Sequence, residues 1–392
     1  MARGYRVERL ADVRPEWGPI RHVMAAPDNT SFALIAEPAE GVHRVVFGGR
    51  VIAETGPHEI MPMSLSFDGT KLAVAKRGRG RGEPTSEIFV NGEKRYDVPF
   101  ETVYRFDWLD DERLAWSAWN TDDLRAKDDT IHYFVNGEDV TGRLEFEPVL
   151  MDRMRHAIHL KEGDRACVIY DDGSRSTPVT VPPGTDRFHW FDPFWATGER
   201  PERPERPEEA WDGARRSVRV RYRGVSGPIF DGIESFGGMR QFALNADGRR
   251  AAYVGIRYSG VARAMGRAVG ASLSRIEGEP RGLSKLWAWP MALLFNPYMG
   301  IGHAYIEGSR RYFPVDHDRE WKKGYRFASD HFYTPHDELV VTASGSDGLR
   351  VVIDEDEGPP FAAVENVRHL AAEDAVCYLA AKGDEILRIV AR

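Results

Sequence analysis

Two kinds of turn alternate along most of the chain, and this alternation constrains the fold more than any other feature. Turns of the first kind are acidic and separate two short apolar runs, as at Asp68-Gly69. Turns of the second kind are tight, as at Asn91-Gly92 and Asn136-Gly137, where Asn and Gly supply the positive φ of two-residue hairpins. Short apolar runs bounded by such turns are typical of β-strands. The sequence therefore predicts an all-β fold built from repeated four-stranded units.

The number and spacing of the turns predict a closed ring of such units. The acidic turns include Asp28, Asp68, Asp111, Glu162, Asp247, Asp337 and Asp374. Most intervals between them are close to the roughly 40–45 residues that a four-stranded unit needs. The two longest intervals place insertions at 184–217 and 259–302, each between the second and third strands of its unit.

The tight turns number one fewer than the acidic turns, so the last unit lacks its fourth strand. Tyr5–Leu10 precedes the first unit and is the predicted substitute. A strand contributed in this way closes the ring and removes exposed sheet edges. We therefore predict one domain over residues 1–392, a seven-bladed β-propeller closed by its N-terminal strand.

Two stretches carry a family resemblance. Leu65–Val74 contains Ser-Phe-Asp-Gly and Leu244–Tyr253 contains Asn-Ala-Asp-Gly, each followed by a second apolar run. These stretches resemble the Ser-Pro-Asp-Gly-Lys repeat of TolB-like propellers, with Phe67 and Ala246 in place of the proline. At the level of the fold the chain is also similar to tryptophan-aspartate-repeat propellers. The resemblance implies a propeller and leaves the function open.

Composition excludes some classes of function. The formal charge of −8 argues against nucleic acid as a partner, because phosphate binding needs clustered Lys and Arg. The first 20 residues lack the apolar core of a secretory signal. The two cysteines, Cys167 and Cys377, lie within apolar runs, as buried thiols do in a reducing compartment. A cytoplasmic location is expected.

Polar residues recur at the start of the first strand when the units are registered on their acidic turns. One column contains Arg21, Met61, Tyr104, Arg155, Arg240 and Asp330. The next contains His22, Pro62, Arg105, His156, Gln241 and His331. The last unit is one residue shorter and contributes Arg368 and His369. Because the first strand of a blade lines the central channel, these residues are predicted to surround one mouth of the channel.

The arginines of these columns predict an anionic ligand. Arginine binds carboxylate and phosphate groups through two parallel hydrogen bonds. The predicted ligand-binding residues are Arg21, Arg105, Arg155, Arg240 and Arg368. The alternative is that they pair with neighbouring acids such as Asp107 or Asp330.

The histidines indicate a metal site or acid–base chemistry. His22, Gln241, His331 and His369 come from consecutive blades and could share a divalent metal. This arrangement is similar to that of oligogalacturonate lyases, propellers that hold a metal with His and Gln at the channel mouth. His156, His331 and His369 are the candidate proton donors and acceptors. The alternative is that these polar residues only cap a water-filled channel.

No nucleotide, flavin or hydrolase-elbow motif occurs in the sequence. If the protein is an enzyme, a lyase or hydrolase is therefore expected, and an oxidoreductase or peptidase is not. The principal hypothesis is a propeller that binds a small anionic ligand at a lidded channel mouth. The alternative is a non-catalytic scaffold that binds a protein partner on the same face.

The two insertions are predicted to rise over that face. The first begins with an aromatic cluster at 188–195, which could wall a pocket or anchor the loop. The second contains a basic amphipathic helix at 261–276 and an apolar segment at 286–305. Pro290 and Pro297 argue against a membrane span in that segment. A lid is the first choice for 261–305, with a homo-oligomer contact or a membrane-surface patch as alternatives.

Overall fold

The computed structural model describes residues 4–56, 62–77, 85–100, 102–119, 131–152, 155–170, 173–181, 207–212, 217–236, 239–240, 242–259 and 309–392. Over these ranges nearly all regular structure is β, apart from a short 3-10 helix, η1 (Pro15–Trp17). The prediction of an all-β chain is confirmed. The chain divides into two compact units, one of 1–203 with 361–392 and the other of 204–360.

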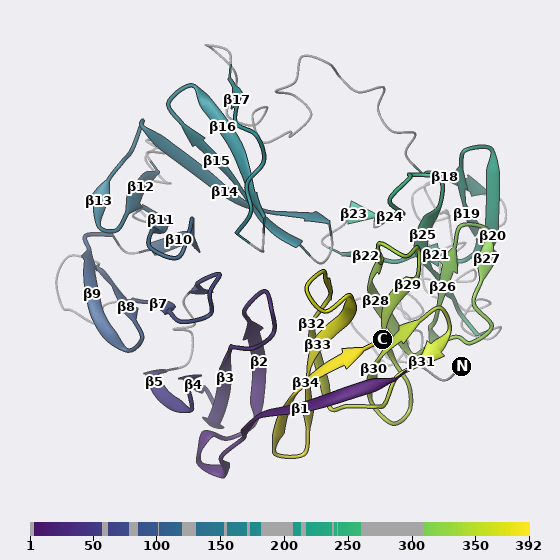
Figure 1. Ribbon diagram of the computed structural model, residues 1–392, viewed down its shortest axis with the longest axis horizontal. Coiled ribbons are helices and arrows are strands. Elements are labelled where there is room, and N and C mark those ends of the chain that lie inside the picture. Colours follow the sequence, from purple (N-terminus) through teal and green to yellow (C-terminus); the bar gives the residue numbers. More distant parts are fainter. Residues whose placement is uncertain are drawn as a thin grey trace, which may run out of the picture. The chain divides into compact units, whose positions relative to one another are not determined.

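Unit 1 consists of consecutive antiparallel sheets, most with neighbouring strands in chain order (Figure 1). The first two sheets are β2 (Ile20–Ala25), β3 (Phe32–Ala39), β4 (Val42–Phe47) and β5 (Arg50–Thr55), then β6 (Met63–Leu65), β7 (Leu72–Arg77), β8 (Ser86–Val90) and β9 (Glu93–Val98). The next two are β10 (Thr102–Trp108), β11 (Leu114–Trp119), β12 (His132–Val135) and β13 (Glu138–Asp139), then β14 (Leu144–Asp152), β15 (Arg155–Glu162), β16 (Arg165–Tyr170) and β17 (Val179–Thr180). This sheet order and connectivity are those of propeller blades.

The N-terminal strand completes the C-terminal sheet, as the turn count predicts. β1 (Tyr5–Asp12) pairs antiparallel with β34 (Glu385–Ala391), and β33 (Ala375–Lys382) and β32 (Ala363–Leu370) follow in the same sheet. The register runs from Tyr5 opposite Ala391 to Asp12 opposite Glu385. The buried guanidinium of Arg388 donates to Glu8 of β1 at 3.0 Å and to Glu373 at 3.3 Å. The predicted pairing of 5–10 with 386–390 is confirmed.

Unit 2 contains further antiparallel sheets. One consists of β28 (Phe327–Tyr333), β29 (Leu339–Ser344), β30 (Leu349–Ile353) and β31 (Asp356–Glu357). Another contains β21 (Gly232–Ile233), β24 (Ala243–Leu244), β25 (Ala251–Arg257), β26 (Arg311–Asp316) and β27 (Arg319–Glu320). A three-stranded sheet is made of β18 (Glu208–Asp212), β19 (Ser217–Tyr222) and β20 (Val225–Phe230), and β22 (Ser235–Phe236) with β23 (Met239–Arg240) forms a hairpin.

One predicted blade differs from the structure. The turn pattern assigns 155–170 and 217–230 to the same sheet, with an insertion between its second and third strands. In the structure β15 and β16 instead lie between β14 and β17, whereas β19 lies between β18 and β20. The sequence pattern did not predict β14, which contains Pro148. β14 is an edge strand, where a proline is tolerated because it need not donate a hydrogen bond to a neighbour.

Most of both insertions lies outside the described residues. The aromatic cluster at 188–195 and the whole segment 261–305 belong to this part of the chain. Within the described residues, no helix is long and apolar enough to cross a membrane. The predicted lid therefore stays a prediction.

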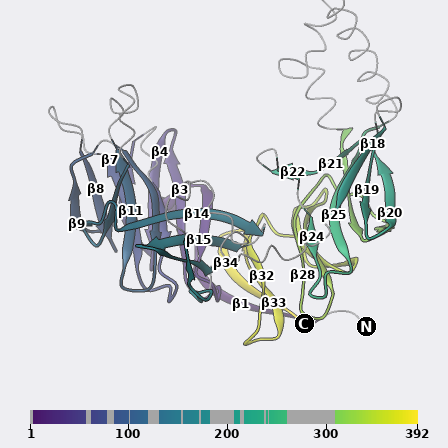
Figure 2. The same cartoon turned by 90° about the horizontal axis from the view of Figure 1, so that it is seen from above.

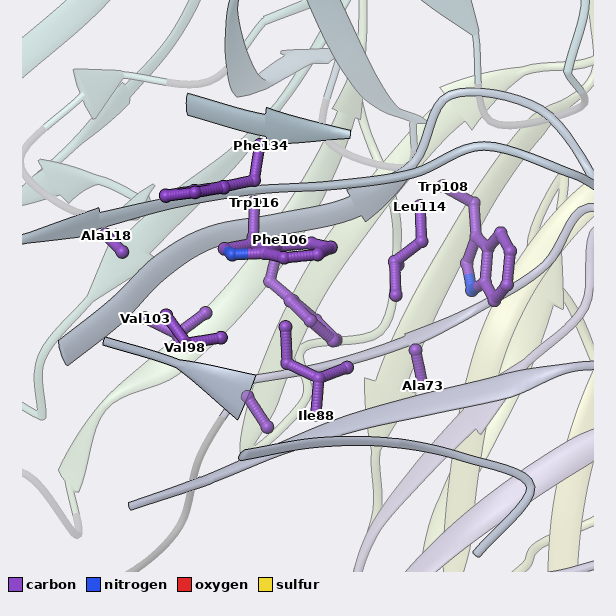
Figure 3. Close-up of a cluster of buried hydrophobic side chains, with 11 residues drawn as sticks. Ala73, Ile88, Val98, Val103, Phe106, Trp108, Leu114, Trp116, Ala118 and Phe134 are labelled. Carbon is purple, nitrogen blue, oxygen red and sulfur yellow. The ribbon is translucent and has the colours of Figure 1, made fainter. Parts of the chain in front are cut away.

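Apolar side chains fill the space between neighbouring sheets of unit 1. Figure 2 shows the strands of these sheets from above. One face of the β10–β13 sheet places Trp116 and Phe134 in a core cluster with Ile88 of the β6–β9 sheet (Figure 3). The Trp116 and Phe134 rings stack at 5.6 Å between centroids. The opposite face packs against the β14–β17 sheet, where the ring of Tyr133 meets Phe146 edge-on at 5.7 Å. Each sheet is therefore held mainly by burial against its neighbours.

The tight turns hold the start of the second strand in three sheets. Asn91, with φ of 53°, accepts a hydrogen bond from Leu72 N at 2.8 Å and donates to Thr70 O at 3.2 Å. Asn136 makes the same pair of bonds in the next sheet. Asp354 takes this place in the β28–β31 sheet and accepts from Leu339 N at 2.9 Å. Asn is favoured here because its side chain bonds locally and tolerates the left-handed region.

Candidate functional site

A β-bulge interrupts the first strand in four sheets, close to the predicted polar columns. The register shifts occur at 20–22 in β2, 103–106 in β10, 329–331 in β28 and 365–368 in β32. A bulge sets two adjacent residues opposite one residue of the partner strand and redirects their side chains. In β2 and β10 the column residues Arg21 and Tyr104-Arg105 fall in the bulge itself, where the strand does not alternate regularly.

Arg21, in the bulge of β2, is held by an acid. Its guanidinium is bound to the carboxylate of Glu37 at the end of β3. The pKa of Glu37 is lowered by a hydrogen bond from Gly41 N and by the bond from Arg21. The neighbouring His22 is exposed, and partial removal from water lowers the pKa of its imidazole. Arg21 thus follows the alternative in which an arginine pairs with a neighbouring acid.

Arg368 and His369 in β32 are likewise engaged within their own sheet. Arg368 Nε donates to Asn366 Oδ1 at 3.1 Å. Asn366 has a φ of 51° and donates through Nδ2 to Asn29 Oδ1 of the neighbouring sheet at 2.6 Å. His369 Nε2 lies 3.4 Å from Asp374 Oδ1. These contacts fix the bulge of β32 against the turn that follows β2.

His331 occupies an apolar column. Val23, Phe106 and His331 each stand the same number of residues before the turn that follows their strand. Only 7%, 6% and 2% of their surfaces, respectively, are exposed. His331 Nε2 lies 3.3 Å from Ala252 O in β25. Within its turn, Asp337 stands one residue later than the equivalent acids stand in the turns of the other units. Aligning the units on Asp337 therefore assigns His331 to a column one position too early. Its surroundings favour a packing role.

Several predicted site residues cannot be placed further. Gln241 lies outside the described residues, as do the side chains of Arg155, His156 and Arg240, whose backbones belong to β15 and β23. His331 belongs to unit 2, whereas His22 and His369 belong to unit 1. Their convergence on a divalent metal, and the catalytic roles of His156, His331 and His369, stay predictions.

The bulge of β10 carries a compact cluster of polar and aromatic side chains. Tyr104 and Arg105 both stand opposite Ser117 of β11, and Ser117 pairs with Tyr133 of β12. Directly paired residues share a face of the sheet, so Arg105, Ser117 and Tyr133 form a row across three strands. Arg105 donates through a terminal nitrogen to the hydroxyl of Tyr133 at 2.5 Å. The guanidinium lies 5.8 Å from the ring centroid of Tyr104 and 6.0 Å from that of Tyr133.

An aromatic pair, of which Tyr104 is exposed and Trp119 half-buried, borders this row. Tyr104 has 53% of its surface exposed, and its ring centroid lies 4.9 Å from that of Trp119, two residues beyond Ser117 in β11. We call these five residues the Arg105 cluster: Tyr104, Arg105, Ser117, Trp119 and Tyr133. The sequence columns contain the first two. The other three were missed because cross-strand register, rather than spacing along the chain, brings them there.

The chain matches no protein-family model and no curated protein. Its matches among solved structures include the β-propeller domain of the Trilobed protease from Pyrococcus furiosus, at 10% identity and a TM-score of 0.29 over 96% of this chain and 93% of that chain. The WD40 domain of SCAP from fission yeast is 9% identical, with a TM-score of 0.33 over 98% and 94%. Oligogalacturonate lyase from Vibrio parahaemolyticus is 8% identical, with a TM-score of 0.27 over 84% and 75%. The likeness is one of fold alone.

Similarity at this level assigns no ligand, partner or reaction, so the chemistry has to come from the residues themselves. The Arg105 cluster combines a permanent positive charge, three hydroxyl groups and the exposed ring of Tyr104. A guanidinium fixed by a phenol and flanked by rings is well suited to bind a planar anion. Tyr, Trp and Arg are also the residues most enriched where proteins bind their partners.

Proposed function

We propose that this protein is a seven-bladed propeller that binds a small anionic ligand where the first strands begin, with Arg105 as the principal anion-binding residue. The Arg105 cluster is the observation that supports this proposal. It lies at the predicted position in the first strand and contains a charged donor, hydroxyl groups and aromatic surface. The count of seven blades rests on the seven acidic turns of the sequence.

The contacts of the arginines favour Arg105 over its counterparts. The charge of Arg21 is balanced by Glu37, and Arg368 is held by Asn366. Arg105 donates to the hydroxyl of Tyr133 and lies beside the rings of Tyr104 and Tyr133. The phenol orients the guanidinium, whose planar fork of donors matches a carboxylate.

Metal-assisted lyase or hydrolase chemistry is a further step that lacks comparable support. It would need His22, Gln241, His331 and His369 to meet, and the contact of His331 with Ala252 supports a packing role for that residue. The proposal is therefore limited to anion binding.

The first prediction tests anion binding with acetate, succinate and phosphate as probes. Arg105→Gln is expected to weaken binding of the carboxylates by about tenfold or more, since a charge-assisted bond to a carboxylate is lost. Ligand-observed NMR titrations on the full chain measure the affinities. Arg95→Gln is the matched control, because Arg95 is exposed in β9 and pairs with Glu93.

Equal affinities of the wild type and Arg105→Gln would contradict the proposal. The alternative of a non-catalytic scaffold for a protein partner predicts that none of the three free anions binds the wild type. Melting curves of both variants show whether a loss of affinity reflects a loss of folded protein.

A further inference from the structure

The same five residues form a tight turn at two places in the chain. Phe-Val-Asn-Gly-Glu occupies 89–93 and 134–138, and in both turns the Asn and the Gly have positive φ. An Asn that precedes Gly loses its side-chain amide readily, because a residue without Cβ leaves the following backbone nitrogen open to approach. Since the local sequence is identical, any difference in reactivity between Asn91 and Asn136 must come from the fold.

The reaction takes place within the chain and needs only water. The backbone nitrogen of Gly137 attacks Cγ of Asn136, so that a bond forms between these two atoms and the bond from Cγ to Nδ2 breaks. The amide proton of Gly137 leaves with Nδ2 as ammonia, and a five-membered cyclic imide remains. Water then opens the imide at either carbonyl and yields aspartate or isoaspartate, with no oxidation or reduction.

In the closed turn the Asn side chain is held against another strand. Asn136 Oδ1 accepts a hydrogen bond from Leu114 N at 2.9 Å, and Nδ2 donates to Glu112 O at 3.0 Å. The backbone nitrogen of Asn136 also donates to Leu114 O at 2.9 Å. Asn91 makes the equivalent bonds in its own sheet. While these bonds last, the carboxamide does not turn toward the next backbone nitrogen, so the turn must open before the reaction can start.

The two hairpins differ in how much structure opposes that opening. β8 and β9 are joined by five residue pairs, and Lys94 bonds to Glu87 across them at 2.9 Å. β12 and β13 are joined by two residue pairs, after which a bond from Val140 N to Tyr133 O continues the ladder. Local opening costs less free energy where fewer contacts have to separate. The turn at Asn136 should therefore open more often than the turn at Asn91.

We propose that Asn136 is a site of spontaneous deamidation in the folded protein, whereas the fold protects Asn91. This inference does not depend on the proposed function. The chain itself is the substrate, and water is the co-reactant. Opening of the β12–β13 hairpin sets the rate.

Arg143 restrains the same hairpin from its far side. Its guanidinium donates to Glu138 Oε1 at 2.7 Å and to the carbonyl oxygen of Asp139 at 2.8 Å, and these two residues make up β13. Both Arg143 and Glu138 are exposed, so the contact can be removed without disturbing the core. It therefore provides a way to change the opening of this hairpin alone.

Modification would weaken the turn in which it occurs. An aspartate at 136 can still accept from Leu114 N, but it has no hydrogen to donate to Glu112 O. Isoaspartate adds one atom to the backbone, and a two-residue hairpin turn has no room for it. Modified molecules should therefore melt at a lower temperature than unmodified ones.

The second prediction compares the two sites within one sample of the full chain. The protein is incubated in mildly alkaline buffer, either folded or unfolded in urea, and peptide mapping by mass spectrometry follows deamidation at each Asn. In urea the two rates should agree to within about twofold. In the folded protein Asn91 should react at least about tenfold more slowly than in urea, and Asn136 at least about threefold faster than Asn91.

Arg143→Gln should speed deamidation of Asn136 by about twofold or more and leave Asn91 unchanged, because it removes restraints on β13 alone. Arg95→Gln is the matched control and should change neither rate, because Arg95 and its partner Glu93 lie within one strand and join no pair of strands.

Equal rates at the two sites of the folded protein, or a faster reaction at Asn91, would overturn the proposal. Folded-state rates as high as those in urea would show that the hydrogen bonds of the turn do not protect the Asn. Acceleration of both sites by Arg143→Gln would show that opening is global and would contradict the role of the hairpin.

Discussion

At the residue scale, a shift of one residue within a turn changes where a side chain lies and what it contacts. The polar columns were predictable because acidic turns give a register, and Arg105 was found in this way. The position of His331 was not predictable, because its turn places the acid Asp337 one residue later. The contact of Arg105 with Tyr133 and its place opposite Ser117 depend on a bulge and on strand pairing, neither of which is visible in the spacing along one strand.

The side-chain hydrogen bonds at the tight turns allow a second comparison between residues. Asn91 and Asn136 each make two hydrogen bonds to the start of the second strand, whereas Asp354 makes one. Burial, together with the nearby Glu338 and Asp316, raises the pKa of the Asp354 carboxyl. A raised pKa means that the ionised carboxylate is less favourable in the folded than in the unfolded chain, so its contribution to stability falls as pH rises through the folded-state pKa.

The third prediction is that Asp354→Asn stabilises the protein at neutral pH. Asn does not ionise and can donate a second bond to the Asp337 carbonyl, the position equivalent to Thr70. The free energy of unfolding at pH 7 is expected to rise by up to about 1 kcal/mol. The gain should be smaller at pH 4.5, where the Asp354 carboxyl is more often protonated. Urea unfolding at both pH values measures it.

The reverse change gives the matched control. Asn136→Asp should lower stability at pH 7 and lower it less at pH 4.5. A gain from Asp354→Asn that is the same at both pH values would show that ionisation of Asp354 does not matter.

At the element scale, counting turns was enough to predict the partner of the N-terminal strand. The deficit of one tight turn identified a missing strand, and Tyr5–Leu10, which precedes the first unit, was the remaining candidate. β14 was missed because Pro148 interrupts it and because the acidic turn at 162–164 already accounted for β15 and β16. A strand whose partner lies across a long insertion cannot be assigned by spacing, since several partners are possible and their packing decides.

The fourth prediction concerns β1. Deleting residues 1–12 should expose the edge of β34 and leave the buried Arg388 without Glu8, so the variant should melt at a lower temperature and aggregate. Size-exclusion chromatography and melting curves measure both effects. A peptide of residues 1–12 added in trans should restore part of the stability. Val7→Thr is the control, because Val7 is exposed and its replacement leaves the strand pairing intact.

A truncated chain with the elution volume and melting temperature of the wild type would contradict this role of β1.

At the scale of the whole molecule, the repeat was visible in the sequence and the exact set of sheets was not. The four-stranded antiparallel sheets follow from turn chemistry that recurs along the chain. The division of 144–230 between two sheets does not follow from it, because β14 and β18 compete with the predicted pairing of β16 with β19. The residues of a turn specify the hairpin that it connects. They do not decide between alternative strand pairings that are separated by a long insertion.

The fifth prediction follows from the closeness of the chain ends. Arg392 N donates to Gly4 O at 3.1 Å, so a short glycine linker can join residues 392 and 4. A circular permutant opened between Gly48 and Gly49, in the β4–β5 turn, should fold and melt within a few degrees of the wild type. In this variant β5 becomes the N-terminal strand. Circular dichroism and thermal melting measure the result, and failure to fold would show that the covalent β4–β5 turn is required.

The pairing of β1 with β34 also determines when this protein can finish folding during its synthesis. β1 (Tyr5–Asp12) leaves the ribosome well before its partner β34 (Glu385–Ala391), because several hundred residues of chain separate them. At roughly 5–20 residues per second, the N-terminal strand waits about 20 to 80 seconds for that partner. Arg6, Glu8 and Arg9 make β1 a charged strand, which discourages mispairing during this wait. Ribosome-bound chains that stop before β34 should therefore keep β1 accessible to protease, however much of the intervening sheet structure has already formed.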